Sequence, residues 1–282
     1  MTTEATVLAA EEDLDSMLLF GVAHFSALAV TVVVTAVLLA VVRLHRDSPA
    51  VGRAITLAGW LMLLVGVGWI IWDLLPGRFD VAQAVPVNLS DWARIIIPLA
   101  LITRASWAVA VAYYWGLTLN LMALLTPDLN YRFSPPVEYA MFWLSHIAAF
   151  IAPVILVWGL GLRPTWRGAG FAFLFTAFWA AAAFVVNLVT GANYGYLRHA
   201  PPDGSPFDLM GPWPVYIFVA AAVVAVEPSR VHHHVSADDR LSRPAVGQNV
   251  LVIHAPATPA QEAPTPGFST AKHSSPWTKP RR

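Results

Sequence analysis

The chain has 282 residues and no net formal charge, with 57% hydrophobic and only 12% charged residues. A soluble globular domain carries about 25% charged residues, so this composition and a mean hydropathy of +0.60 predict an integral membrane protein. The absence of cysteine excludes disulfides and thiolate sites, and the zero net charge argues against nucleic acid as a partner. No strand-like alternation occurs, which favours an all-α, polytopic helical bundle over a barrel.

Seven apolar segments predict seven transmembrane helices, in chain order at 17–42, 54–75, 88–103, 106–125, 138–162, 168–189 and 212–226. The third is the weakest, because its purely apolar part is too short to cross a hydrocarbon core of about 30 Å. It spans only if Ser90, Asp91 and Arg94 enter the membrane. The acidic segment 1–16 lacks the basic region of a signal peptide, and the Pro-, Ala-, Ser- and Thr-rich residues 227–282 predict a disordered tail.

The distribution of arginine predicts the orientation of the bundle. With seven spans, one side receives the arginines of three loops, which are Arg43, Arg46, Arg53, Arg104, Arg163 and Arg167, and also the C-terminal tail. By the positive-inside rule the N-terminus lies outside and the tail is cytoplasmic, in a multi-pass protein of the plasma or inner membrane. If segment 88–103 did not cross, the later loops would swap sides and this bias would blur.

Polar side chains on five of the seven segments are predicted to lie in the outer half of the bilayer: His24, Ser90, Asp91, Asn120, His146 and Asn187. Ionisable groups at membrane depth tend to be functional, and an imidazole serves as proton shuttle or ligand. The Gly- and Pro-rich outer segments, including Asn193 and Tyr194, would form a rim. We therefore expect a polar cavity that opens outward, with His24, Asn120, Asn187, Asn193 and Tyr194 as candidate substrate-binding residues.

Each of these residues also has a purely structural interpretation. Ser90 and Asp91 are typical of a helix N-terminus, where a carboxylate caps free N–H groups, and Arg94 lies one turn away to neutralise Asp91. The asparagines are typical of hydrogen bonds between transmembrane helices. The concentration of six such residues on one side is what favours a site.

Several motifs in fixed order resemble the YwaF-like family of bacterial integral membrane proteins. They are Ala112-Tyr113-Tyr114-Trp115-Gly116-Leu117, Ala123-Leu124-Leu125-Thr126-Pro127-Asp128-Leu129, Phe142-Trp143-Leu144-Ser145-His146, Gly161-Leu162-Arg163-Pro164, Asn187, Gly191-Ala192-Asn193-Tyr194-Gly195-Tyr196-Leu197 and Gly211-Pro212-Trp213-Pro214-Val215-Tyr216. The resemblance covers most of residues 20–226, and the first span, with Gly21 and His24, is similar to the family's opening helix.

The resemblance implies a seven-helix bundle and acyl transfer on a lipid. The YwaF-like family looks distantly related to an animal membrane acyltransferase that makes polyunsaturated ether phospholipids, and more remotely to androgen-induced lipid hydrolases with a threonine nucleophile. Its histidine corresponds to His146, and its nucleophile-like cysteine corresponds to Ser90, within Pro86-Val87-Asn88-Leu89-Ser90. The chain also departs from the family at Asn120 and Met122, where Thr and Gln are usual.

The resulting hypothesis is a lipid acyltransferase or hydrolase with Ser90 as nucleophile and His146 as base, and with Asp91, Asn187 or His24 orienting the base or stabilising the oxyanion. A serine hydroxyl is far less acidic than a thiol, so the change from cysteine keeps acyl chemistry only with a base in reach, and loss of activity is the other interpretation. Two further alternatives stay open, a non-enzymatic binder or transporter and haem or metal binding by His24 and His146. We expect no cofactor or metal and expect membrane lipids as partners, and a homo-oligomer stays open.

Overall fold

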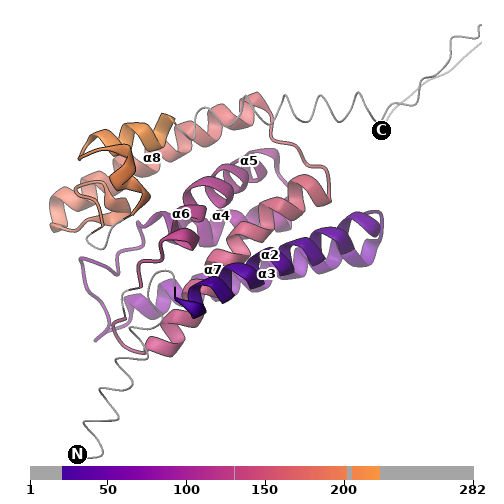
Figure 1. The fold of residues 1–282 in the computed structure, drawn as a ribbon, viewed down its shortest axis with the longest axis horizontal. Coiled ribbons are helices and arrows are strands. Elements are labelled where there is room, and N and C mark those ends of the chain that lie inside the picture. The colour runs from indigo at the N-terminus through magenta and orange to yellow at the C-terminus, as the bar shows by residue number, and fades with distance from the viewer. Residues whose placement is uncertain (1–20, 130, 202–204, 223–282) are drawn as a thin grey trace, which may run out of the picture. The chain divides into compact units, whose positions relative to one another are not determined.

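The computed structural model describes residues 21–129, 131–201 and 205–222, and these residues form helices joined by short connections (Figure 1). The helices are α2 (Val22–Leu44), α3 (Pro49–Leu74), α4 (Leu89–Thr103), α5 (Ser106–Tyr114), η1 (Trp115–Leu119), α6 (Asn120–Leu125), α7 (Pro135–Val154), η2 (Ile155–Gly159), α8 (Trp166–Thr190), η3 (Tyr194–Tyr196) and η4 (Pro206–Met210). The described residues contain no strand, which confirms the predicted all-α class for this part of the chain. The predicted segments 1–16 and 227–282 lie outside the described residues.

Five helices are long and apolar enough to cross a membrane: Val22–Leu44, Pro49–Leu74, Ser106–Leu125, Pro135–Gly159 and Trp166–Thr190. They correspond to the predicted first, second, fourth, fifth and sixth spans, so the chain has several apolar helices as expected. The predicted third span is the 15-residue α4. The seventh is described only up to residue 222, and its residues 215–222 are helical.

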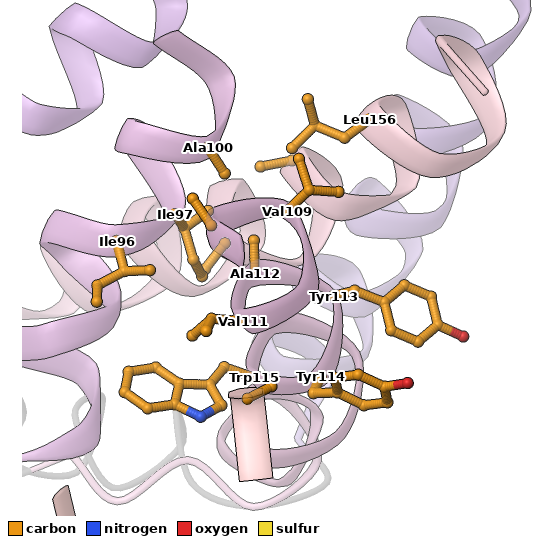
Figure 2. Close-up of a cluster of buried hydrophobic side chains, with 14 of the residues drawn as sticks. Ile96, Ile97, Ala100, Val109, Val111, Ala112, Tyr113, Tyr114, Trp115 and Leu156 are labelled. Carbon is orange, nitrogen blue, oxygen red and sulfur yellow. The ribbon is translucent and has the colours of Figure 1, made fainter. Parts of the chain in front are cut away.

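The helix α5 lies at the centre of the bundle. It packs against α4 on one side, α8 on another and α7 on a third, and every residue from Ala108 to Trp115 is buried. A helix that is apolar all round is suited to such a position. Figure 2 shows the resulting core, in which Ile97 and Ala100 of α4 meet Val109 and Ala112 of α5 beside Leu156 of η2.

The outer helices expose apolar side chains. Only 17% of the most apolar stretch of α2, and the same share of α3, is buried inside the protein. In Figure 1, α8 lies at one edge of the bundle and α2 and α3 lie at the other. Exposed apolar surface on helices of this length is what a bilayer would cover.

The helices α3 and α4 run antiparallel in close contact. A Cβ atom added at Gly66 would lie 2.9 Å from Cβ of Arg94, and one added at Gly59 would lie 2.8 Å from Cγ1 of Ile102. Farther along, Nη2 of Arg104 donates a 3.0 Å hydrogen bond to the Gly52 carbonyl. These contacts run in opposite directions along the two helices, from Gly66 to Gly52 in α3 and from Arg94 in α4 to Arg104 at its end. The short helix α4 therefore packs against α3 over most of the length of α4.

Two prolines and two π-helical turns interrupt the central helices. Pro98 in α4 and Pro153 in α7 lack an N–H group, so the carbonyls of Arg94 and Ala149 lose their usual donors within the helix. The π-helical turns η1 and η2 follow α5 and α7, and η1 ends directly before Asn120. Such turns shift the register of the helix that follows and often occur near functional sites.

Candidate functional site

A cavity of about 190 Å³ lies between α3, α4, α6 and α7. Most of its lining is apolar, and its polar lining residues are Ser90, Arg94, Asn120, Ser145 and His146. Leu61 of α3 and Leu144 of α7 also line it, although they are 55% and 59% exposed. The cavity therefore borders the exposed apolar surface of these two helices.

The hydroxyl of Ser90 is available to a ligand. Asn88 is the N-cap of α4 and its backbone N–H donates to Oδ2 of Asp91 at 3.0 Å, so the start of the helix is capped without Ser90. Oγ of Ser90 forms no hydrogen bond with any residue that the structure describes. A half-buried hydroxyl in a largely apolar cavity is thus left without an internal partner.

The imidazole of His146 is held in one orientation by its own helix. Nδ1 lies 2.7 Å from the Phe142 carbonyl, and the two rings lie 4.1 Å apart between centroids. A carbonyl oxygen only accepts hydrogen bonds, so in the neutral ring Nδ1 carries the proton and Nε2 keeps its lone pair. Nε2 has no hydrogen-bond partner among the described residues, and a lone pair of this kind is what a general base requires.

Asn120 connects the backbone of α7 to α6 beside this imidazole. Its Nδ2 donates to the His146 carbonyl at 2.9 Å, and its side chain also lines the cavity. Asn120 therefore forms a hydrogen bond between two helices, as its structural interpretation predicts. Its side chain also faces the cavity. Nearby, Oγ of Ser145 donates to the Phe142 carbonyl at 3.0 Å.

Asp91 and Arg94 form an ion pair at the start of α4. Nη1 of Arg94 lies 2.6 Å from Oδ1 of Asp91, and both side chains are largely buried. Since Oδ2 of Asp91 caps the helix, both of its oxygens are engaged. The Phe142 carbonyl, rather than Asp91, orients the imidazole of His146.

His24 is not part of the cavity lining. Its Nε2 lies 2.9 Å from the Leu124 carbonyl at the end of α6, and its ring lies 5.6 Å from that of Trp143 in α7. His24 is almost fully buried, and these contacts join α2 to two other helices.

Asn187 and Tyr194 form a second polar cluster, outside the cavity lining. Asn187 makes two hydrogen bonds with the backbone of Tyr194, one to its carbonyl at 2.9 Å and one from its N–H at 2.7 Å. The Tyr194 hydroxyl donates to the Val81 carbonyl at 2.8 Å and accepts from the Val85 N–H at 3.0 Å. This cluster fixes the segment that leads into α4, so its effect on Ser90 is indirect.

Asn193 stabilises the loop that follows α8. Its Oδ1 accepts hydrogen bonds from the N–H groups of Arg198 and His199, and its Nδ2 donates to the His199 carbonyl. Of the five predicted substrate-binding residues, Asn120 alone belongs to the cavity lining that the structure describes.

Comparison with known proteins identifies the family. The model of the TMEM164 family matches residues 19–226, which is well over half of the chain and includes every residue of the cavity. The chain belongs to the TMEM164 family. No curated protein and no solved structure gives a significant match. Membership of this membrane protein family, together with the apolar helices, establishes the chain as an integral membrane protein of several helices.

Sequence reasoning missed two polar residues of the cavity in this TMEM164 protein. Arg94 was expected only to neutralise Asp91, and Ser145 was not considered as part of a site. A signal for Arg94 was present, because residues four apart share one face of a helix and Arg94 follows Ser90 by four positions. The apolar lining carried no signal, since apolar residues occupy every face of these helices.

Proposed function

We propose that this TMEM164 protein is a membrane enzyme that carries out acyl chemistry on a lipid. The observation that carries the proposal is the shared cavity of Ser90 and His146. In it, a hydroxyl without an internal hydrogen bond faces the same space as an imidazole whose tautomer leaves Nε2 able to accept a proton. The resemblance of Ser90 and His146 to the nucleophile and histidine of the YwaF-like family supports the same roles.

In the proposed reaction, Oγ of Ser90 attacks the carbonyl carbon of a lipid ester while its proton passes to Nε2 of His146. The bond between that carbon and the ester oxygen then breaks, and the departing alcohol takes the proton from His146. The acyl group, now on Ser90, passes to water in hydrolysis or to the hydroxyl of a second lipid in transfer. The second step regenerates both side chains.

The position of the cavity supports a substrate that arrives from the bilayer. Leu61 and Leu144 belong both to its wall and to the exposed apolar surface, so an acyl chain reaching the cavity between α3 and α7 need not cross water. The membrane partners in this proposal are therefore lipids, and the mostly apolar lining suits their hydrocarbon chains.

We also propose that α4 and the segment at 212–226 cross the membrane, which gives seven spans with the N-terminus outside and the tail cytoplasmic. The contact of α4 with α3, from Gly66 to Gly52, supports a crossing, although its 15 residues extend only about 22 Å. The arginine distribution then places the cytoplasmic side of the plasma or inner membrane at the loops around Arg46 and Arg163.

The catalytic proposal is tested by labelling the purified protein, in native lipid, with a fluorophosphonate probe. We expect the wild-type protein to be labelled, Ser90→Ala to abolish labelling, and His146→Ala to slow it by about a hundredfold or more, because a general base contributes at least that factor. Ser90→Cys, which restores the residue usual in the YwaF-like family, should instead react with iodoacetamide, a thiol-directed probe for which the chain has no other target.

Ser145→Ala is the matched control, because Ser145 also lines the cavity but is hydrogen-bonded to Phe142. Oγ of Ser145 also lies 3.4 Å from Nδ1 of His146, so labelling of Ser145→Ala should stay close to that of the wild type and far above that of Ser90→Ala. Labelling that survives Ser90→Ala and disappears in Ser145→Ala would show that Ser145 is the nucleophile and would contradict the role proposed for Ser90. A wild-type protein that is never labelled would instead favour a non-enzymatic lipid-binding cavity.

A further inference from the structure

Three arginines near the end of α3 keep buried nitrogen atoms without an acceptor. Nε of Arg94, Nη1 of Arg132 and Nη1 of Arg78 have no hydrogen-bond partner in the described part of the chain. Arg132 pairs with Asp73, the penultimate residue of α3, at 2.8 Å, the guanidinium of Arg78 lies 3.8 Å from the centre of the Trp72 ring, and the charge of Arg94 also acts on Asp73. A buried guanidinium N–H left unpaired is costly, which makes three together in one region unusual.

The carboxylates in the same region already have donors. Nη2 of Arg132 donates to Asp73 at 2.8 Å, and both oxygens of Asp91 are engaged at the start of α4. Oε1 and Oε2 of Glu138 accept hydrogen bonds from the backbone N–H groups of 132–134. The guanidinium groups of Arg78 and Arg132 also lie over the ring faces of Trp72 and Phe133, so the surplus donor without an aromatic partner among the described residues belongs to Arg94.

Arg94 is the member of this set that reaches the cavity. It lines the same space as Ser90, one helical turn farther along α4, and its charge also acts on His146. Its pair with Asp91 uses Nη1, and neither Nε, which protein atoms enclose, nor Nη2 has a hydrogen-bond partner among the described residues. A guanidinium group matches the geometry of carboxylate and phosphate oxygens, so the surplus donor points to an anionic oxygen.

We propose that Arg94 binds an anionic oxygen of the cavity ligand, which belongs to a phosphate or a carboxylate group. The inference deepens the proposed function, because it names a chemical class of ligand for the same cavity. In this arrangement the apolar wall between α3 and α7 holds the hydrocarbon chain, and Arg94 holds the charged end near Ser90. Arg132 and Arg78 add positive potential near that end without lining the cavity.

The test measures the affinity of the purified full-length protein, in neutral detergent, for three ligands with the same oleoyl chain. Oleate presents a carboxylate, 1-oleoylglycerol 3-phosphate presents a phosphate, and monoolein is uncharged. We expect one anionic ligand to bind more tightly than monoolein, and the better of the two identifies the source of the oxygen. Arg94→Gln should weaken that ligand by about tenfold or more and leave monoolein unchanged, because a charge-assisted hydrogen bond is lost.

Arg94→Gln leaves Asp91 buried without its cation, so the double variant Asp91→Asn/Arg94→Gln, which removes both charges, is measured beside it. Arg43→Gln is the control for loss of one positive charge, since Arg43 is exposed and bonds the Trp158 carbonyl away from the cavity. Unchanged affinity for both anionic ligands in the two Arg94 variants would overturn the proposal. An equal loss for monoolein would also overturn it, because it would show a general structural effect.

Binding and labelling separate the two proposals. Ser90→Ala should lose fluorophosphonate labelling and still bind the anionic ligand more tightly than monoolein. If Arg94-dependent binding is found but no variant is ever labelled, the enzyme proposal fails and the anion site stands. If Ser90 is labelled but Arg94→Gln binds every ligand normally, the enzyme proposal stands and the anion site fails.

Discussion

Asparagine side chains in this bundle hold backbone groups, and their consequences differ with position. Asn120 bonds the His146 carbonyl from a cavity-lining position, whereas Asn187 is fully buried and bonds both the N–H and the carbonyl of Tyr194. A side chain that satisfies two buried backbone groups at once has no apolar equivalent, because its removal leaves both groups unpaired.

Asn187→Leu is therefore expected to lower the free energy of unfolding by about 1–3 kcal/mol, the cost of leaving such groups without partners. Thermal unfolding in detergent measures this as a lower melting temperature. Leu188→Ala is the control, because Leu188 is the next residue of α8 and is 63% exposed, so its truncation should change stability little. Equal melting temperatures for Asn187→Leu and the wild type would show that the two hydrogen bonds contribute nothing net.

At the scale of elements, glycine spacing decides how closely helices approach. Gly59 and Gly66 are seven residues apart in α3, which places them on one face, and both lie against α4. The close approach of α3 brings Leu61 and Met62 to the same cavity as Ser90. Small residues at such contacts are the usual means of bringing transmembrane helices together.

Gly66→Ala should therefore force α3 and α4 apart, because the new Cβ would lie 2.9 Å from Cβ and 3.0 Å from the carbonyl oxygen of Arg94. Overpacking of this kind costs about 1–3 kcal/mol, and we expect a lower melting temperature with slower labelling of Ser90. Gly68→Ala is the matched control in the same helix, since a Cβ there meets no atom within 4 Å. Its stability should equal or slightly exceed that of the wild type.

Local capping chemistry sets the ends of the helices, and these ends agree with the predicted spans to different degrees. The predicted third span began at residue 88, and α4 begins at Leu89 after the N-cap Asn88. The fifth span was predicted to begin at 138, but α7 begins three residues earlier, because Pro135 suits the first turn of a helix. The π-helical turns were not predicted, because the bond pattern of a π-turn depends on packing as well as on local sequence.

At the scale of the whole molecule, the proposed seven-span topology depends on whether α4 crosses the bilayer. Only α4 and the continuous helix at 106–125 separate the loop containing Asp80 from the loop containing Asp128. If both helices cross, the two loops lie on the same side of the membrane. If α4 does not cross, they lie on opposite sides.

The absence of native cysteine allows a direct test with single-cysteine variants and an impermeant maleimide on intact cells. Asp80, Asp128 and Arg46 are exposed, so the reagent can reach a Cys at each position. We expect Asp80→Cys and Asp128→Cys to be labelled from outside and Arg46→Cys only after permeabilisation. Labelling of Asp80→Cys without Asp128→Cys would contradict a crossing by α4.

The sequence by itself determined that the chain is a helical membrane protein, because hydrophobic length and low charge are properties of each segment alone. It also singled out Ser90, Asn120 and His146, since polar residues stand out against an apolar background. Only the tertiary structure decided that these three share a cavity while Asn187 and Tyr194 do not. The rotation of each helix is set by contacts with its neighbours, and a chain apolar on every face leaves that rotation unspecified until the helices pack.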